Sequence, residues 1–245
     1  MTSDTRRFEL LLREELSGRN TGEGFGTLKE KRMHRVIRRY VLDDPDCWEI
    51  PLSTGAVADV LSGGTVYEIQ TGSFYPLSGK IARITAETGL NITVVHPVIV
   101  KNRIIKIDPD GSVSEPKTSP VRESFFSLLA ECVYIAGLFA SGRLTVRALY
   151  VEAEDYRLRI PGKRRMKKIE VLPTKLVGEE SFSSARDFAA KLPPLPSPFT
   201  SADFSAASRL RGRDISRALI ALKLLGVCEE TEKSGRRKCY IMRGN

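Results

Sequence analysis

The residues best suited to chemistry are two carboxylates, Asp59 and Glu68, on either side of a Ser-Gly-Gly-Thr segment at 62–65. A Gly-Gly pair between two short apolar runs favours a hairpin with a two-residue turn. In the resulting register Asp59 lies directly opposite Glu68, with Cβ atoms roughly 5 Å apart. Like charges directly opposite destabilise a sheet, so the pair calls for a cation, and carboxylate oxygens suit Mg²⁺ or Mn²⁺.

Gln70 and Lys80 extend this constellation. Gln70 lies two residues beyond Glu68 and therefore shares its strand face. The spacing of apolar residues predicts a helix over 73–86, with Lys80 on its apolar side. A lysine there either pairs with the two carboxylates or reaches solvent along its stem.

The pattern of Asp, a turn and Glu-x-Gln on the next strand resembles the core of the PD-(D/E)XK nuclease superfamily. Within it, the chain most resembles a prokaryotic branch of nuclease-like proteins whose signature is EIQT. The similarity covers residues 27 to about 155, and more loosely 180–245, where some members carry a winged helix. The segments that carry it are EKRMHRVIRRYV, DPDCWEI, ADVL, YEIQTGSF, GKIARI, TVVHPV and KTSPVRESFFSLL.

This resemblance implies a restriction-endonuclease-like mixed-sheet sandwich in which Asp59 and Glu68 hold the metal. The superfamily pattern has lysine where this chain has Gln70, and glutamine carries no positive charge. The resemblance allows Lys80, from the following helix, to help activate water in its place. Gln70 would then orient the water or a ligand.

A third acid, Glu30, stands near the start of a predicted helix over 27–41, with His34 one turn further along. In the resembled family an acid at this place often completes the metal site. Thr27 and Glu30 also form a T-x-x-E capping box, which explains the glutamate without chemistry. Glu49 either faces the same site or is an exposed strand residue.

Composition limits the remaining classes of protein. A chain of 245 residues with 41% hydrophobic residues suits one large or two smaller soluble domains. We expect a cytoplasmic protein without a membrane partner, because no segment is typical of a transmembrane helix or a signal peptide. Four widely spaced cysteines and two histidines argue against a zinc site, and no G-x-S-x-G motif indicates a serine hydrolase.

The charge distribution indicates a polyanionic partner, since the net charge is +9 and the pI is near 9.5. Residues 157–168 contain seven basic residues and no acid, and residues 209–245 contain ten basic and four acidic residues. Both segments suit a phosphate backbone, although basic loops are also often merely solvated. Lys117 and Arg122 beside Ser-Pro are weaker candidates for phosphate contact.

The C-terminal region follows a stiff PPLPSP segment at 193–198. Helices are predicted at 184–192, 200–209 and 212–225, then a hairpin of strands at 227–231 and 238–242. This order resembles a winged helix-turn-helix whose third helix, with Arg213 and Arg217 facing outward, enters a major groove. Such domains also pack against protein instead. The predicted nucleic-acid contacts are Arg211, Arg213, Arg217, Lys233, Arg236, Arg237 and Lys238.

The other elements predict an α/β fold with a mixed sheet. Strands are expected at 48–52, 57–61, 66–70, 91–100, 103–107 and 144–152, a short helix at 8–15, and a long helix at 120–139 capped by Thr118 or Ser119. The domain plan is an extension at 1–26, a nuclease-like domain at 27–177 and a winged-helix domain at 178–245.

The function predicted from the sequence is metal-dependent hydrolysis of nucleic acid, in the first place DNA, guided by the winged helix. The alternative is a DNA-binding or regulatory protein that keeps this fold without the chemistry. Gln70 favours the alternative, and the carboxylate pair favours the enzyme. A homodimer is a further expectation, because nucleases that cut both strands often pair with two-fold symmetry.

Overall fold

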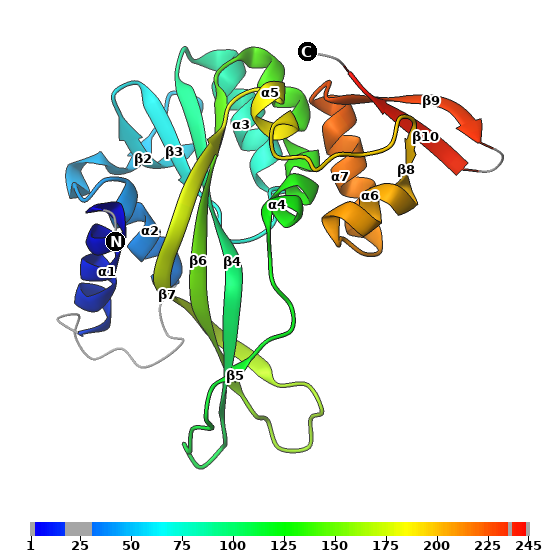
Figure 1. The fold of residues 1–245 in the computed structure, drawn as a ribbon. Helices are drawn as coiled ribbons and strands as arrows, with labels where there is room; N and C mark the ends of the chain where they lie inside the picture. The colour runs from blue at the N-terminus through cyan, green and yellow to red at the C-terminus, as the bar shows by residue number, and fades with distance from the viewer. Residues whose placement is uncertain (1–2, 18–30, 235–236, 244–245) are drawn as a thin grey trace.

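The structure, a computed structural model, describes residues 3–17, 31–234 and 237–243, and a seven-stranded mixed sheet lies at its centre (Figure 1). The order is β1-β2-β3-β4-β6-β7, and β5 pairs with β4. β3 and β6 run parallel to β4, and the other pairs are antiparallel. The strands are β1 (Trp48–Pro51), β2 (Val57–Ser62), β3 (Thr65–Ile69), β4 (Asn91–Ile107), β5 (Lys117–Thr118), β6 (Leu144–Leu158) and β7 (Lys167–Phe182).

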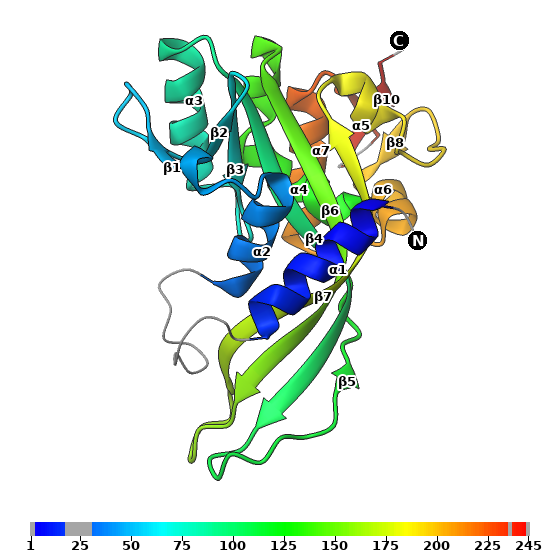
Figure 2. The same ribbon diagram turned by 90° about the vertical axis from the view of Figure 1, so that its left-hand side faces the viewer.

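Helices cover both faces of this sheet, which confirms the expected α/β class. α1 (Ser3–Leu16) and α2 (Arg32–Val41) lie on one face, and α3 (Leu77–Glu87) and α4 (Phe125–Glu131) lie on the other (Figures 1 and 2). Each side has its own cluster of buried apolar residues. In the described ranges no helix is both long and apolar enough to cross a membrane.

The N-terminal segment contributes to this body. The helix expected at 8–15 is longer, and its residues Phe8, Leu11 and Leu12 are buried. They pack with α2 and the inner face of the sheet in one cluster. Residues 3–16, which were predicted to belong to an extension, therefore form a helix that is part of the packed body of the protein.

Three strands continue beyond the body and form an arm (Figure 1). The prediction of separate strands at 91–100 and 103–107 was wrong, because β4 runs unbroken through 17 residues. β6 likewise extends six residues past the predicted end at 152, and β7 was not predicted. The paired ladder of β4 and β6 reaches Ile107 and Leu158. In the arm the strands are exposed to solvent, so polar side chains are compatible with continued strand structure there.

The helix expected at 120–139 is much shorter. α4 begins after Ser124, whose side chain caps it, and ends at Glu131, after which two short 3₁₀ helices follow at Cys132–Tyr134 (η2) and Ala136–Ser141 (η3). The predicted cap at Thr118 or Ser119 is wrong. The preceding backbone is bonded to β4 instead, because the N–H groups of Ser119 and Glu123 donate to β4 carbonyls.

The C-terminal region contains the predicted helices and hairpin. Its elements are α5 (Ala185–Ala189), β8 (Phe199–Thr200), α6 (Ser201–Ser208), α7 (Arg213–Leu224), β9 (Cys228–Ser234) and β10 (Arg237–Met242). The three strands form a small sheet in the order β8-β10-β9. Thr200 caps α6 as predicted, in a capping box with Asp203. The boundary predicted at 178 falls inside β7.

α7 packs against α4 and η2 (Figure 1). The expectation that Arg217 faces outward was wrong, since its guanidinium lies 3.5 Å from Glu131 and donates to the Tyr134 hydroxyl at 2.9 Å. Leu219 and Leu222 are buried in the same cluster as Leu128 of α4. One apolar core therefore joins the C-terminal region to the central sheet.

Candidate functional site

The glycine turn of the β2–β3 hairpin has the predicted register. Leu61 pairs with Val66 and Ser62 with Thr65, so the prediction is confirmed. Gly63 and Gly64 have φ of 53° and 73°, the left-handed values that this two-residue turn needs at both positions. The ladder ends at the pair Val60 and Tyr67, so Asp59 and Glu68 are the next residues beyond it on the two strands, and the Ile69 N–H donates to Asp59 Oδ2.

Glu68 is a buried carboxylate with one paired and one unpaired oxygen. Its side chain is 3% exposed, and Oε2 accepts a hydrogen bond from Lys80 Nζ at 2.5 Å. Lys80 also donates to the carbonyl of Val57 at 2.6 Å. Oε1 is buried and has no hydrogen-bond partner in the part of the chain that the structure describes.

Lys80 reaches the hairpin from α3. The predicted helix is present but begins at Leu77 instead of residue 73, and the three apolar residues around Lys80, at positions 77, 81 and 84, are buried. This packing fixes the helix over the hairpin, so the lysine stem extends along an apolar surface to Glu68. Of the two alternatives for Lys80, the structure shows pairing with a carboxylate.

The two carboxylates have pKa values shifted in opposite directions. Burial and, to a smaller extent, the charge of Asp59 raise the pKa of Glu68 to about 7, against the opposing effect of Lys80. Burial also acts to raise the pKa of Asp59, but hydrogen bonds from His34 and the Ile69 N–H, with the charge of Lys80, lower it below its usual value. At neutral pH Asp59 is therefore ionised while Glu68 is near its titration midpoint.

Asp59 is held from the opposite side by α2. His34 Nε2 lies 3.3 Å from Asp59 Oδ2, and the same oxygen accepts a hydrogen bond from the N–H of Ile69 at 2.7 Å. Glu30 lies outside the described residues. Within the described ranges there is no cluster of three or more His, Cys, Asp or Glu side chains that would enclose a metal ion.

Gln70 is bound to the loop that follows β3. Its side-chain Nε2 donates to the carbonyl of Ser73 at 2.5 Å, and its own carbonyl accepts from His96 Nδ1 at 2.5 Å. Gln70 thus fixes the loop beside the site. Glu49 has a side chain that is 70% exposed and accepts from Arg38, as expected of an exposed strand residue.

The residues predicted to touch nucleic acid differ in their exposure and in their partners. Arg211, Arg213 and Arg237 are exposed. Lys238 is paired with Glu230 at 3.1 Å. Arg217, as described above, joins α7 to α4. The side chain of Lys233 and the whole of Arg236 lie outside the described residues.

We predict a pH-dependent contribution of Glu68 to stability. The folded state raises its pKa from 4.5 to about 7, so it binds this proton more tightly than the unfolded state. Stability attributable to Glu68 is therefore full below pH 4.5 and falls as the pH rises to 7, by about 3 kcal/mol in total. Glu68→Gln should remove this loss, as measured by urea unfolding between pH 5 and 8 in chelator.

The matched control is Glu87→Gln, an exposed acid on α3. It should leave the pH dependence of unfolding as it is in the wild type. Parallel stability curves for the wild type and Glu68→Gln would show that the pKa of Glu68 is not raised.

A mixed seven-stranded sheet covered on both faces, with a buried glutamate bound to a lysine at one hairpin, places the chain among α/β proteins. Residues 31–182 match the family described as Domain of unknown function (DUF8091), and the chain belongs to that family. The match ends with the last residue of β7.

The chain is also similar to a protein of Treponema pallidum (strain Nichols) described as an uncharacterized protein. The two are 26% identical over 220 residues, which cover 87% of this chain and 86% of the relative. The similarity thus extends beyond the family match. No solved structure matches the chain.

Proposed function

We propose that this protein is a metal-dependent hydrolase of nucleic-acid phosphodiester bonds, with DNA as the first candidate substrate. The observation that carries the proposal is Glu68, whose buried Oε1 has no donor among the described residues. An unsatisfied buried carboxylate oxygen is costly, and a bound cation would remove that cost. Asp59 supplies a second, ionised carboxylate at the same hairpin. This donor set fits Mg²⁺ or Mn²⁺.

Asp59 and Glu68 would hold the ion, and Glu30, which lies outside the described residues, is the candidate third acid. When bound, the metal would lower the pKa of water and act as a Lewis acid toward the phosphate. Lys80 would place its ammonium beside the scissile phosphate and stabilise the negative charge that develops there. His34 would keep Asp59 oriented.

Lys80 supports this proposal despite Gln70 in the usual lysine position. Its Nζ lies 2.5 Å from Glu68 Oε2, so an ammonium is present beside the carboxylate pair although it comes from α3. Gln70 would keep the following loop in place through its bond to Ser73. In the superfamily pattern one lysine stands at this position of the strand. Here Lys80 would supply the positive charge, and Gln70 would hold the backbone that follows the strand.

The basic tip of the arm supports nucleic acid as the partner. Along the arm, Lys101 pairs with Glu152 and Arg103 with Glu154. At the tip, the exposed residues Lys163, Arg164, Arg165 and Lys167 have no hydrogen bond or ion pair from their side chains to any described residue. Four cations that are unpaired among the described residues therefore lie at the loop between β6 and β7 and at the first residue of β7; Figure 2 shows this loop at the end of the arm.

The C-terminal region supports DNA as the form of nucleic acid. Its order of helix, strand, two helices and hairpin matches that of a winged helix-turn-helix. Because α7 packs on α4, the exposed Arg213 at its start and Arg237 in the hairpin remain as its phosphate contacts. The N-terminal end of α7 would therefore contact the DNA.

We predict that the arm tip contributes to the salt dependence of DNA binding. Replacing Lys163, Arg164, Arg165 and Lys167 by glutamine should weaken binding and reduce the slope of log K against log salt by up to about 3.6, at about 0.9 for each phosphate that is no longer neutralised. Fluorescence anisotropy of labelled DNA over a series of salt concentrations measures the binding constant and this slope. The double control Lys101→Gln with Arg103→Gln removes cations that are already paired, and should change the slope much less.

A cleavage assay tests the proposed function. Linear duplex DNA, single-stranded DNA and RNA are incubated with wild-type protein in Mg²⁺, in Mn²⁺ and in chelator. The expected result is cleavage of DNA with either metal and no cleavage in chelator. Protein that binds DNA but leaves every substrate intact with both metals would overturn the proposal.

That second outcome defines the other candidate function, a DNA-binding protein that has kept the fold without the chemistry. The observation that favours it is the ion pair of Lys80 with Glu68, which already neutralises part of the site without a metal. Gln70 in the lysine position agrees with it. A homodimer is a proposal under either function, and sedimentation velocity with and without DNA tests it.

A further inference from the structure

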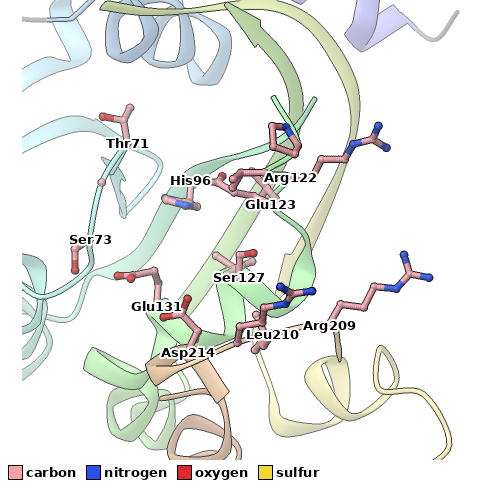
Figure 3. Close-up of a pocket in the computed structure, with 17 residues that line it drawn as sticks. Thr71, Ser73, His96, Arg122, Glu123, Ser127, Glu131, Arg209, Leu210 and Asp214 are labelled. Carbon is pink, nitrogen blue, oxygen red and sulfur yellow. The ribbon is translucent and has the colours of Figure 1, made fainter. Parts of the chain in front are cut away.

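A cavity of about 950 Å³ lies between the end of β3, α4 and the connection from α6 to α7 (Figure 3). The β3 side contributes residues 71–73 and His96. The segment 120–123 and α4 form a second wall, and residues 209–211 with Asp214 form a third. Its volume is within the range of sites that hold small ligands.

Three arginines and three acids line the cavity, and the arginines form no ion pair within the described residues. Arg122, Arg209 and Arg211 line it, and their side chains have no hydrogen bond or ion pair to any residue that the structure describes. Figure 3 shows the long side chains of Arg122 and Arg209 extending along the same side of the cavity. Guanidinium groups in this arrangement suit an anion with several oxygens.

The acids of the cavity are already engaged. Glu123 accepts a hydrogen bond from the N–H of Ile99, and Glu131 accepts one from the N–H of Phe74. Asp214 and Glu131 both pair with Arg217. These carboxylates make no ion pair with the three lining arginines, whose guanidinium groups are therefore available to a bound anion.

Arg209 occupies a backbone position at which glycine is the usual residue. Its φ is 60°, and it ends α6 in the left-handed region. Bonds of Ser205 Oγ to the carbonyl of Leu210, and of the Leu210 N–H to Ser208 Oγ, hold this turn. A strained backbone that carries a cation at a cavity is typical of a functional site.

The remaining walls suit an apolar ring that carries a hydrogen-bond donor. Val98, Val121 and Leu128 line the cavity beside its polar groups. His96 Nδ1 donates to the carbonyl of Gln70, and burial lowers the pKa of the ring, which keeps it neutral. Nε2 is then an acceptor, and no partner for it is found in the described ranges. A nucleotide is one ligand that combines phosphate groups with a flat ring and hydrogen-bond donors.

We propose that this cavity binds a nucleotide, with its phosphates on Arg122, Arg209 and Arg211 and its base against the apolar wall. Two sources share this chemistry, a free nucleotide and the phosphorylated end of a nucleic-acid strand. The second rests on the proposed function. Its geometry is favourable, because Gln70 is bonded to two cavity residues and lies two positions after Glu68.

Isothermal titration calorimetry in chelator tests the proposal with four probes: ATP, AMP, a 5′-phosphorylated oligothymidylate of eight residues and the same oligomer with a 5′-hydroxyl. At least one phosphorylated probe should bind. ATP or AMP alone identifies a free nucleotide, and preference for the 5′-phosphate identifies a strand end. No binding of any probe would overturn the proposal.

The variants connect binding to the cavity. Arg122→Gln, Arg209→Gln and Arg211→Gln should each weaken binding roughly tenfold or more, because each removes a charge-assisted contact. Val121→Glu adds a negative charge at an exposed position and should weaken binding without removing an arginine. Arg186→Gln, an exposed arginine of α5 outside the cavity, should have no effect.

Two results test nucleotide binding in the cavity independently of the proposed nuclease function. Asp59→Asn should bind the probe as the wild type does, because the hairpin carboxylates do not line the cavity. Equal affinity of the three arginine variants, of Val121→Glu and of the wild type would overturn the cavity as the binding site, whatever the outcome of the cleavage assay.

Discussion

Glu68→Gln and Asp59→Asn are each expected to lower metal-dependent cleavage by about 10³-fold or more, while DNA binding stays close to that of the wild type. Each substitution removes a carboxylate charge from the proposed metal site but keeps the shape of the side chain. A metal contributes several kcal/mol of charge stabilisation in the transition state, and about 4 kcal/mol corresponds to 10³-fold. Single-turnover cleavage with Mg²⁺ measures the rate.

The pH profile of the same reaction gives an independent check. Glu68 must lose its proton to hold a cation, and burial together with Asp59 raises its pKa to about 7. With Mg²⁺ kept well below saturation, the rate of the wild type should therefore rise with pH and level off above about pH 7. Glu87→Gln, on the exposed side of α3, should cleave like the wild type. Full activity of both carboxylate variants would show that the hairpin is not the active site.

Phe8→Ala is expected to cost about 3–5 kcal/mol of unfolding free energy. Phe8 is fully buried, and its ring meets Tyr40 of α2 edge to face at 5.3 Å. Through this contact and its packing on β7, α1 covers one face of the sheet. A domain has only about 5–15 kcal/mol of stability in total, so the loss should be visible in the urea midpoint.

Leu10→Ala is the control on the same helix, because Leu10 is 57% exposed. It should change stability by no more than about 0.5 kcal/mol. Similar small effects of both substitutions would mean that α1 does not form part of the core in solution.

The hairpin and α3 could be predicted from the sequence because their determinants are local. Gly63 and Gly64 specify the turn by their own backbone freedom, and the turn then sets the register of both strands. The apolar spacing of α3 places Lys80 on the side that meets Glu68. Only the choice between this ion pair and solvent required the structure.

The long strands could not be predicted because their limits are set by tertiary context. β7 contains Pro173 and Gly178, which interrupt a strand pattern, and it is the last strand of the sheet. An edge strand tolerates proline and bulges, and the β6–β7 register shifts at three places. Residues 101–103 are polar, and for this reason the sequence predicted two strands where the structure has the single strand β4.

The nucleotide cavity could not be found from the sequence because its walls come from distant segments. Arg122 stands in an extended segment that was predicted as helix, and Arg209 follows α6 by one residue. Only the packing of α7 on α4 brings the two together. The position of Arg217 could not be predicted for the same reason. The spacing of residues in α7 is compatible with Arg217 facing solvent and with Arg217 facing α4.

If the protein binds duplex DNA as proposed, the continuous ladder of the arm would set its reach along the duplex. From Lys101 to Ile107 β4 rises roughly 20 Å at about 3.3 Å per residue, and it is hydrogen-bonded to β6 over that distance. Successive base pairs are about 3.4 Å apart, so the arm spans about six of them. Its tip is carried on paired strands, and little ordering entropy is lost when it meets a phosphate backbone. A bound duplex should therefore be protected about six base pairs further on the arm's side than on the other.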